Sequence, residues 1–229
     1  MIYATKNASD KLNPSMPIPI PFSHKILLAY LLTGVLALLS VAFFDRSIAE
    51  FMHTHSQSNF LFEGFSKIPL LLEILAAAIV LLSFHARYQT TLFHIRRIII
   101  LVAIIASSIR VAAKIIFGRT WPETWTKDNL SWISDGVEAF HPFSLSNSFH
   151  SFPSGHALLT FAFASLFWRF APQYRLVWFL CMIAVIIGQL GQNYHYLGDL
   201  LAGGLIGTLV THLTINRYSQ FFQAQKKAQ

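Results

Sequence analysis

Six apolar runs, each close to the length of a bilayer crossing, constrain most strongly what this chain can fold into. They cover approximately residues 26–44, 68–84, 98–117, 156–170, 176–190 and 199–215. A helix needs about 20 mostly apolar residues to cross the hydrocarbon core of a bilayer. The sequence therefore predicts an all-α, polytopic membrane protein with six transmembrane helices.

The composition agrees with a membrane protein and argues against a nucleic-acid partner. Hydrophobic residues make up 54% of the chain and charged residues only 12%, which is unusual for a soluble core. The net charge of +7 could suit nucleic acid, but the basic residues gather in short segments between the apolar runs, where they orient a chain in a bilayer. The single cysteine, Cys181, lies inside an apolar run and is expected to be a small buried residue.

The basic residues also predict the orientation, because Lys and Arg favour cytoplasmic segments. With the N-terminus inside, eleven face the cytoplasm and four lie opposite, and the remaining two, Arg110 and Lys114, lie within the third run. The cytoplasmic set is Lys6, Lys11, Lys25, Arg87, Arg96, Arg97, Arg169, Arg175, Arg217, Lys226 and Lys227, and the opposite set is Arg46, Lys67, Arg119 and Lys127. Both termini are then cytoplasmic, and we expect the protein to lie in the cytoplasmic (inner) membrane.

The runs also divide the chain. Residues 1–25 read as a cytoplasmic arm instead of a signal peptide, because the apolar run that follows is long enough to span. Residues 26–217 form the six-span domain, and 218–229 form a cytoplasmic tail. The loop 121–152 is the longest connection outside the membrane, and we expect it to lie over the functional site as a lid or collar.

Three short stretches contain candidate functional residues, and each lies at the end of a span that this topology places on the outer face. In Pro153-Ser154-Gly155-His156, a helix beginning near Gly155 would point free backbone N–H groups at an anion beside a histidine. An ordinary helix start capped by Ser154 explains the same residues. His195 and Asp199 are four residues apart, so on one helix face the carboxylate could orient the imidazole.

The third stretch runs from Lys114 to Pro122, and ionisable side chains within a span are functional candidates because burying them is costly. Lys114 and Arg110 share a helix face. Both could instead be structural: one side chain could extend to the membrane surface while the other pairs with Glu73. We favour this structural pairing with Glu73 for Arg110.

Together these residues resemble the type 2 phosphatidic acid phosphatase superfamily over approximately residues 114–199. Its pattern is Lys, six residues, Arg-Pro; then Pro-Ser-Gly-His; then Ser-Arg, five residues, His, three residues, Asp. The matching residues are Lys114, Pro122, Pro153, Ser154, Gly155, His156, His195 and Asp199. Two positions depart from it: Trp121 stands where the first motif has arginine, and Gly188-Gln189 stands where the third has Ser-Arg.

The resemblance implies a mechanism without metal or cofactor. His195, oriented by Asp199, would attack phosphorus and form a phosphohistidine, while His156 protonates the leaving alkoxide. Lys114, Ser154 and Gly155 would hold the phosphate oxygens. We expect Arg119 to replace the missing arginine and Gln189 to offer a neutral hydrogen bond. The remaining histidines, including His53, His55, His141 and His150, show no convincing metal-ligand pattern and are interpreted as surface residues.

The leading hypothesis is a membrane-embedded phosphatase of a lipid phosphate or diphosphate, whose partners are the lipid substrate and the bilayer. A lipid phosphotransferase using the same phosphohistidine is an alternative, because the acceptor pocket lies outside the motifs. A catalytically silent lipid-binding or transport protein is a third possibility, suggested by Trp121 and Gln189.

Overall fold

The computed structural model describes residues 19–56, 60–125 and 129–227. Over these residues the chain forms helices and three isolated β-bridges but no strand. The predicted all-α fold class is therefore confirmed.

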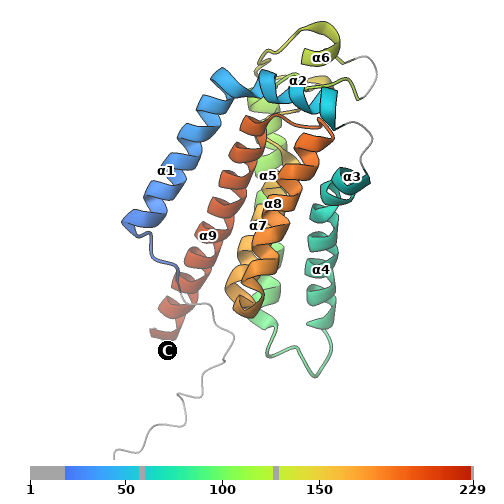
Figure 1. Cartoon of the computed structure of the whole chain (residues 1–229). Helices are drawn as coiled ribbons and strands as arrows, with labels where there is room; N and C mark the ends of the chain where they lie inside the picture. Colours follow the sequence, from blue (N-terminus) through green and yellow to red (C-terminus); the bar gives the residue numbers. More distant parts are fainter. Residues whose placement is uncertain (1–18, 57–59, 126–128, 228–229) are drawn as a thin grey trace, which may run out of the picture.

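Long helices run side by side, and short elements cross one end of them (Figure 1). The helices are α1 His24–Leu39, α2 Asp45–His55, α3 Phe60–Ser66, α4 Ile68–Leu82, α5 Phe93–Phe117, α6 Trp132–Asp135, α7 Gly155–Phe170, α8 Arg175–Gly191 and α9 Leu197–Lys227. A π-helical turn, Ser40–Phe44, joins α1 to α2, which turns across the end of the bundle beneath α6. The connection between α8 and α9 lies at this same end.

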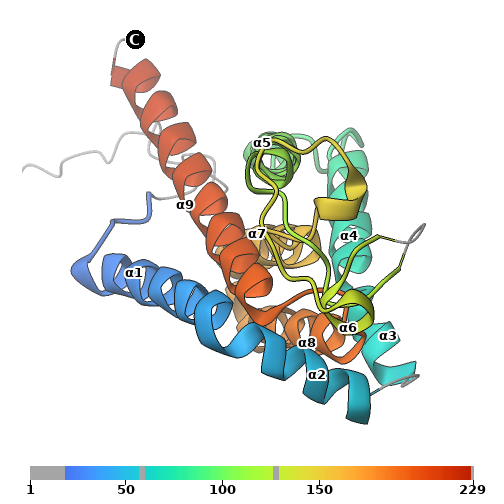
Figure 2. The ribbon, with the colours of Figure 1, turned by 90° about the horizontal axis from the view of Figure 1, so that it is seen from above.

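Helices occupy all six predicted ranges, and five stretches of the described chain are long and apolar enough to cross a membrane. These are His24–His55, Phe60–Leu82, Phe93–Phe117, Pro172–Gly191 and Leu197–Gln225. The exception is α7, with 16 residues. It contacts α4, α5, α8 and α9 and lies among them when the bundle is viewed from its end (Figure 2).

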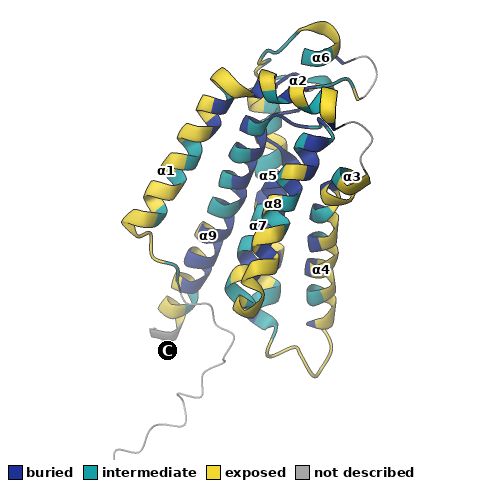
Figure 3. Cartoon of the chain, viewed as in Figure 1, coloured by how far each residue is buried: buried dark blue, intermediate teal, exposed yellow. Residues whose placement is uncertain are grey.

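The outer surface of the long helices is apolar, as a lipid-facing surface requires. Large side chains there remain exposed, including Leu31 at 65%, Leu38 at 72%, Leu81 at 71% and Leu176 at 69%. The buried residues concentrate on α7 and on the faces that surround it (Figure 3). The bundle therefore has its tightest packing at the centre.

Helix boundaries differ from those expected at both ends of the chain. Helix α1 begins at His24, two residues before the predicted start of the first span, and most of the predicted N-terminal arm lies outside the described residues. Helix α9 continues beyond residue 217 to Lys227. It continues because Tyr218 is buried and its hydroxyl lies 2.9 Å from His94 Nδ1, which ties this part of α9 to α5.

The closest helix contact brings α7 against α9 through glycines. A Cβ on Gly203 would lie 2.4 Å from the carbonyl oxygen of Ser154, and one on Gly207 would lie 2.1 Å from that of Leu158. Small residues four apart allow backbones in a membrane to approach this closely. The contact also aligns the start of α7 with the start of α9, where the Ser154 N–H donates to the carbonyl of Asp199 over 3.0 Å.

The predicted orientation can be tested with two cysteines placed at opposite ends of the bundle in a Cys181→Ala background. Leu130 and Thr90 are both exposed, so accessibility to a reagent depends on the side of the membrane. We expect an impermeant thiol reagent to label Leu130→Cys in intact cells and Thr90→Cys only after the membrane is opened. The reverse labelling pattern would contradict the orientation.

Candidate active site

A cavity of about 900 Å³ opens at the end of the bundle where α5 finishes and α7 begins. Its lining residues are Ser66, Lys67, Pro69, Leu70, Glu73, Arg110, Val111, Lys114, Trp121, Trp125, Asn147, His150, Gly155, His156, Leu159, Tyr194 and His195. Loop 121–152 supplies Trp121, Trp125, Asn147 and His150, as expected of a collar around the site.

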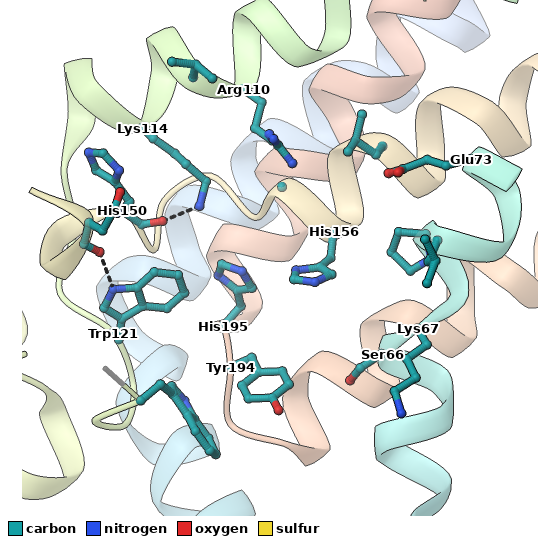
Figure 4. Close-up of a pocket in the computed structure, with 17 residues that line it drawn as sticks. Ser66, Lys67, Glu73, Arg110, Lys114, Trp121, His150, His156, Tyr194 and His195 are labelled. Carbon is teal, nitrogen blue, oxygen red and sulfur yellow. Dashed lines mark hydrogen bonds between the residues drawn. The ribbon is translucent and has the colours of Figure 1, made fainter. Parts of the chain in front are cut away.

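The cavity brings the three predicted stretches together. Lys114 reaches it from the last turn of α5, Gly155 and His156 from the first turn of α7, and His195 from the connection before α9. The imidazole rings of His156 and His195 have centroids 6.0 Å apart (Figure 4). Two histidines and a lysine therefore face one space, beside the first backbone N–H groups of α7.

The buried His195 is oriented through its Nδ1 atom, which lies 3.6 Å from Asp199 Oδ2 and 3.4 Å from Ser151 Oγ. Burial lowers the pKa of His195 below its ordinary value, and the nearby carboxylate of Asp199 acts in the opposite direction. The net effect favours the neutral imidazole. With Nδ1 held in this way, Nε2 is the nitrogen available to the cavity.

Ser151 is a member of the site that sequence reasoning missed. Its hydroxyl donates to Asp199 Oδ2 over 2.5 Å, and its N–H donates to the carbonyl of Arg119 over 3.1 Å. It thus fixes the carboxylate that orients His195. A serine in a serine-rich loop has no distinguishing pattern, so only the fold identifies it.

The expectation that Arg119 binds the phosphate is not met by this geometry. Arg119 is fully buried and does not line the cavity. Its Nη1 lies 2.6 Å from Asp199 Oδ1 and 2.9 Å from Asp45 Oδ2, and its Nη2 lies 2.8 Å from Glu138 Oε1. These three carboxylates hold the guanidinium behind His195.

The charge of Arg119 is fixed by these partners. Burial alone would lower the pKa of Arg119, but the carboxylates of Asp199, Asp45 and Glu138 outweigh it and raise that pKa above its ordinary value. The Tyr196 ring covers the guanidinium, with its centroid 4.1 Å from Cζ. Arg119 is therefore a positioning residue that holds Asp199, and Asp199 in turn holds His195.

Trp121 lines the cavity at the position where the family pattern has arginine. Its ring centroid lies 5.1 Å from that of His195 and 5.3 Å from Lys114 Nζ, and its indole N–H donates to the carbonyl of Asn147 over 3.0 Å. Position 121 thus belongs to the site. The side chain there is flat and uncharged, so it shapes the cavity beside the histidine without attracting an anion.

Ser154 and Gln189 are not among the lining residues, although both were expected to contact phosphate. Ser154 is buried and its hydroxyl caps α7 by accepting from the Ala157 N–H over 3.4 Å, which is the alternative that the sequence left open. Gln189 is fully buried, and its amide has no hydrogen-bond partner among the described residues. The preceding residue, Gly188, lies against α3, where a Cβ would come within 2.6 Å of Ser66 N.

Arg110 lines the cavity together with Glu73, the residue with which it was expected to pair. The described residues contain no ion pair between them. His150, interpreted from the sequence as a surface residue, also lines the cavity, and its carbonyl accepts from Lys114 Nζ (Figure 4). No pattern in the sequence distinguishes His150 from the histidines that lie outside the cavity.

Removing the Arg119 guanidinium should strongly destabilise the fold, because it would leave buried carboxylates without a counter-charge. We expect Arg119→Met to lower the free energy of unfolding by about 3–5 kcal/mol. Arg46→Gln is the matched control: Arg46 pairs with Glu138 at the edge of the same network, and its side chain is 54% exposed, so its loss should cost about 1 kcal/mol or less. Denaturant unfolding in detergent micelles measures both. Equal, small losses would contradict the positioning role.

Several known proteins are similar to this chain. Lipid A 1-phosphatase of Rhizobium johnstonii is 35% identical over 79 residues, which are 34% of this chain and 32% of that protein. Phospholipid phosphatase 2 of Rattus norvegicus is 28% identical over 144 residues, which are 54% of this chain and 52% of that protein. The chain thus spans about a third of the length of the first of these curated relatives and about half of the second.

One solved structure is that of the first transmembrane PAP2 type phosphatidylglycerolphosphate phosphatase from Bacillus subtilis. Its sequence is 15% identical to that of this chain, and the two structures superpose with a TM-score of 0.48. The match covers 88% of this chain and 95% of that one. The family model described as PAP2 superfamily matches residues 96–223, which is more than half of the chain and includes every motif residue discussed above. The resemblance drawn from the motifs is confirmed, and the chain belongs to the PAP2 superfamily.

Proposed function

We propose that this protein is a membrane-embedded phosphatase that hydrolyses a lipid phosphate or diphosphate through a phosphohistidine. The observation that carries the proposal is that His195, backed by Asp199, faces His156 within one cavity that also contains Lys114 and Gly155. A nucleophile and a separate proton donor are what a double displacement at phosphorus requires.

The chemistry assigns one role to each histidine. Nε2 of His195 attacks phosphorus, a P–N bond forms, and the ester P–O bond breaks as His156 gives its proton to the leaving alkoxide. Water then attacks phosphorus while His156 takes a proton from it, the P–N bond breaks, and inorganic phosphate leaves. Lys114 and the Gly155 N–H stabilise the charge on the phosphate oxygens, where a preorganised donor contributes most.

A lipid is the substrate class that suits this cavity best. Leu70 on α4 and Val111 on α5 line it and are 56% and 53% exposed, so an apolar path leads from the outer surface of the bundle toward the histidines. A head group can enter sideways while its chains stay in the bilayer. We place the protein in the cytoplasmic membrane with both termini inside and the cavity on the outer face, as the distribution of Lys and Arg predicts.

The decisive experiment measures inorganic phosphate released by the purified protein from a panel of lipid phosphates and diphosphates in mixed micelles. We expect turnover of at least one lipid, none in His195→Ala, and no loss of activity in EDTA. Loss in EDTA that a divalent ion restores would overturn the metal-free mechanism. Transfer of the phosphoryl group to a second lipid without phosphate release would identify a phosphotransferase instead, and binding without either reaction would identify a silent lipid-binding protein.

The role of His156 predicts a dependence on the leaving group. General acid catalysis contributes about 10²–10⁴-fold, and an aryl phosphate needs little protonation of its leaving group. His156→Ala should therefore slow hydrolysis of an alkyl lipid phosphate by about that factor and slow that of an aryl phosphate much less. The ratio of the two kcat/KM values provides the measurement. An equal loss on both substrates would argue that His156 binds phosphate without donating a proton.

A further inference from the structure

Arg110 is a charged side chain in the cavity that the mechanism above does not use. It lies on α5, one turn before Lys114, within a helix that is long and apolar enough to span a membrane. An unpaired charge in such a helix is costly and usually functional. Among the described residues, no hydrogen bond or ion pair satisfies its guanidinium, although Glu73 lines the same cavity.

The stem of Arg110 lies directly on the first residue of α7. A Cβ added to Gly155 would come within 2.7 Å of Arg110 Cδ, 3.4 Å of Cγ and 3.7 Å of Nε. The absence of a side chain at Gly155 thus makes room for Arg110, whose guanidinium points into the cavity toward His156 (Figure 4). This places five N–H donors beside the N–H groups of α7.

The other cations near the cavity have partners of their own. Lys67 pairs with Glu63 over 2.6 Å, and Arg119 is enclosed by carboxylates. Lys114 gives one of its three N–H groups to the carbonyl of His150 and keeps the others for a phosphate. Of the arginines in the described part of the chain, Arg110 is the one that lines the cavity. Its planar fork can bind two oxygens of a phosphate at once, which a lysine cannot do.

We propose that Arg110, held in place by Gly155, supplies the guanidinium that binds the substrate phosphate and replaces the arginine absent at position 121. Positions 110 and 121 line the same cavity, so a guanidinium from either can reach the same anion. The assignment rests on the proposed function for the identity of the substrate, but it does not require that the bound phosphate turn over.

Binding of inorganic phosphate to the purified full chain, measured by calorimetry in detergent, tests this without reference to activity. We expect Arg110→Gln to weaken phosphate binding by about 10- to 100-fold, the range for a hydrogen bond between charged groups. Arg110→Lys should recover part of the loss. Arg97→Gln makes the same charge change on the same helix, away from the cavity, and should bind as the wild type does.

Two further variants sharpen the test. Trp121→Arg in the Arg110→Gln background should raise the affinity for phosphate at least tenfold above that of Arg110→Gln alone. A double variant that binds phosphate no more tightly than Arg110→Gln would show that Arg110 does not replace residue 121. Gly155→Ala keeps every charge but displaces the stem of Arg110, so it should weaken binding in the wild type and add little in Arg110→Gln. This variant keeps the proposal testable if Arg110→Gln fails to fold.

The outcomes separate the two proposals. Unchanged affinity in Arg110→Gln, with or without a lower melting temperature, would show that Arg110 does not bind the phosphate and would overturn the inference, as would a wild type that does not bind phosphate. A wild type that binds phosphate through Arg110 but releases none from any lipid would support the inference while overturning the proposed hydrolysis.

Discussion

The buried guanidinium of Arg119 is the interaction on which the rest of the site depends. A charge taken out of water is stable only when it is closely paired, and Arg119 is satisfied by acids from three distant parts of the chain. Asp45 lies at the start of α2, Glu138 lies in the collar loop and Asp199 lies in the first turn of α9. One side chain thus ties the start of α2, the collar loop and the start of α9 together.

This network fixes His195 through the two oxygens of Asp199. Oδ1 faces Arg119, and Oδ2 accepts from Ser151 and faces His195. The carboxylate therefore cannot turn away from the imidazole without breaking a buried ion pair. The glycines of α9 set the other half of the geometry, because the contact at Gly203 brings the start of α7, and with it His156, up to the same level.

The elements that hydropathy could predict were those whose cause is local. Apolar runs of the right length indicated the helices, and the spacing of His195 and Asp199 on one helical turn indicated their pairing. The central helix α7 has close to its predicted length, but its place among α4, α5, α8 and α9 could not be predicted, because neighbours in space are not visible in a single apolar run. The extension of α9 likewise depends on His94, which contacts Tyr218 from another helix.

The burial of Arg119 could not be predicted from the sequence, for the same physical reason. Arg119 is two residues from the vacant motif position and Arg110 is eleven away, so proximity along the chain favoured Arg119. Two of the carboxylates that capture Arg119, Asp45 and Asp199, are separated from it by more than 70 residues, and no local pattern indicates that they meet there. Gln189 was misassigned in a similar way, since the approach of α3 to Gly188 is a tertiary contact.

The contacts of Arg119 show why one guanidinium cannot both hold Asp199 and bind a phosphate in the proposed mechanism. In Arg119 the Nε, Nη1 and Nη2 groups all donate to carboxylates, and the surrounding negative charge cancels its own. Such a group offers an incoming anion neither a free donor nor a net attraction. A phosphate monoester carries a charge of about −1.5 to −2 near neutral pH, so cations that face the cavity must balance it. Arg110 and Lys114, one helical turn apart on α5, both line the cavity, so the proposed phosphate site has its balancing charge there and does not need Arg119.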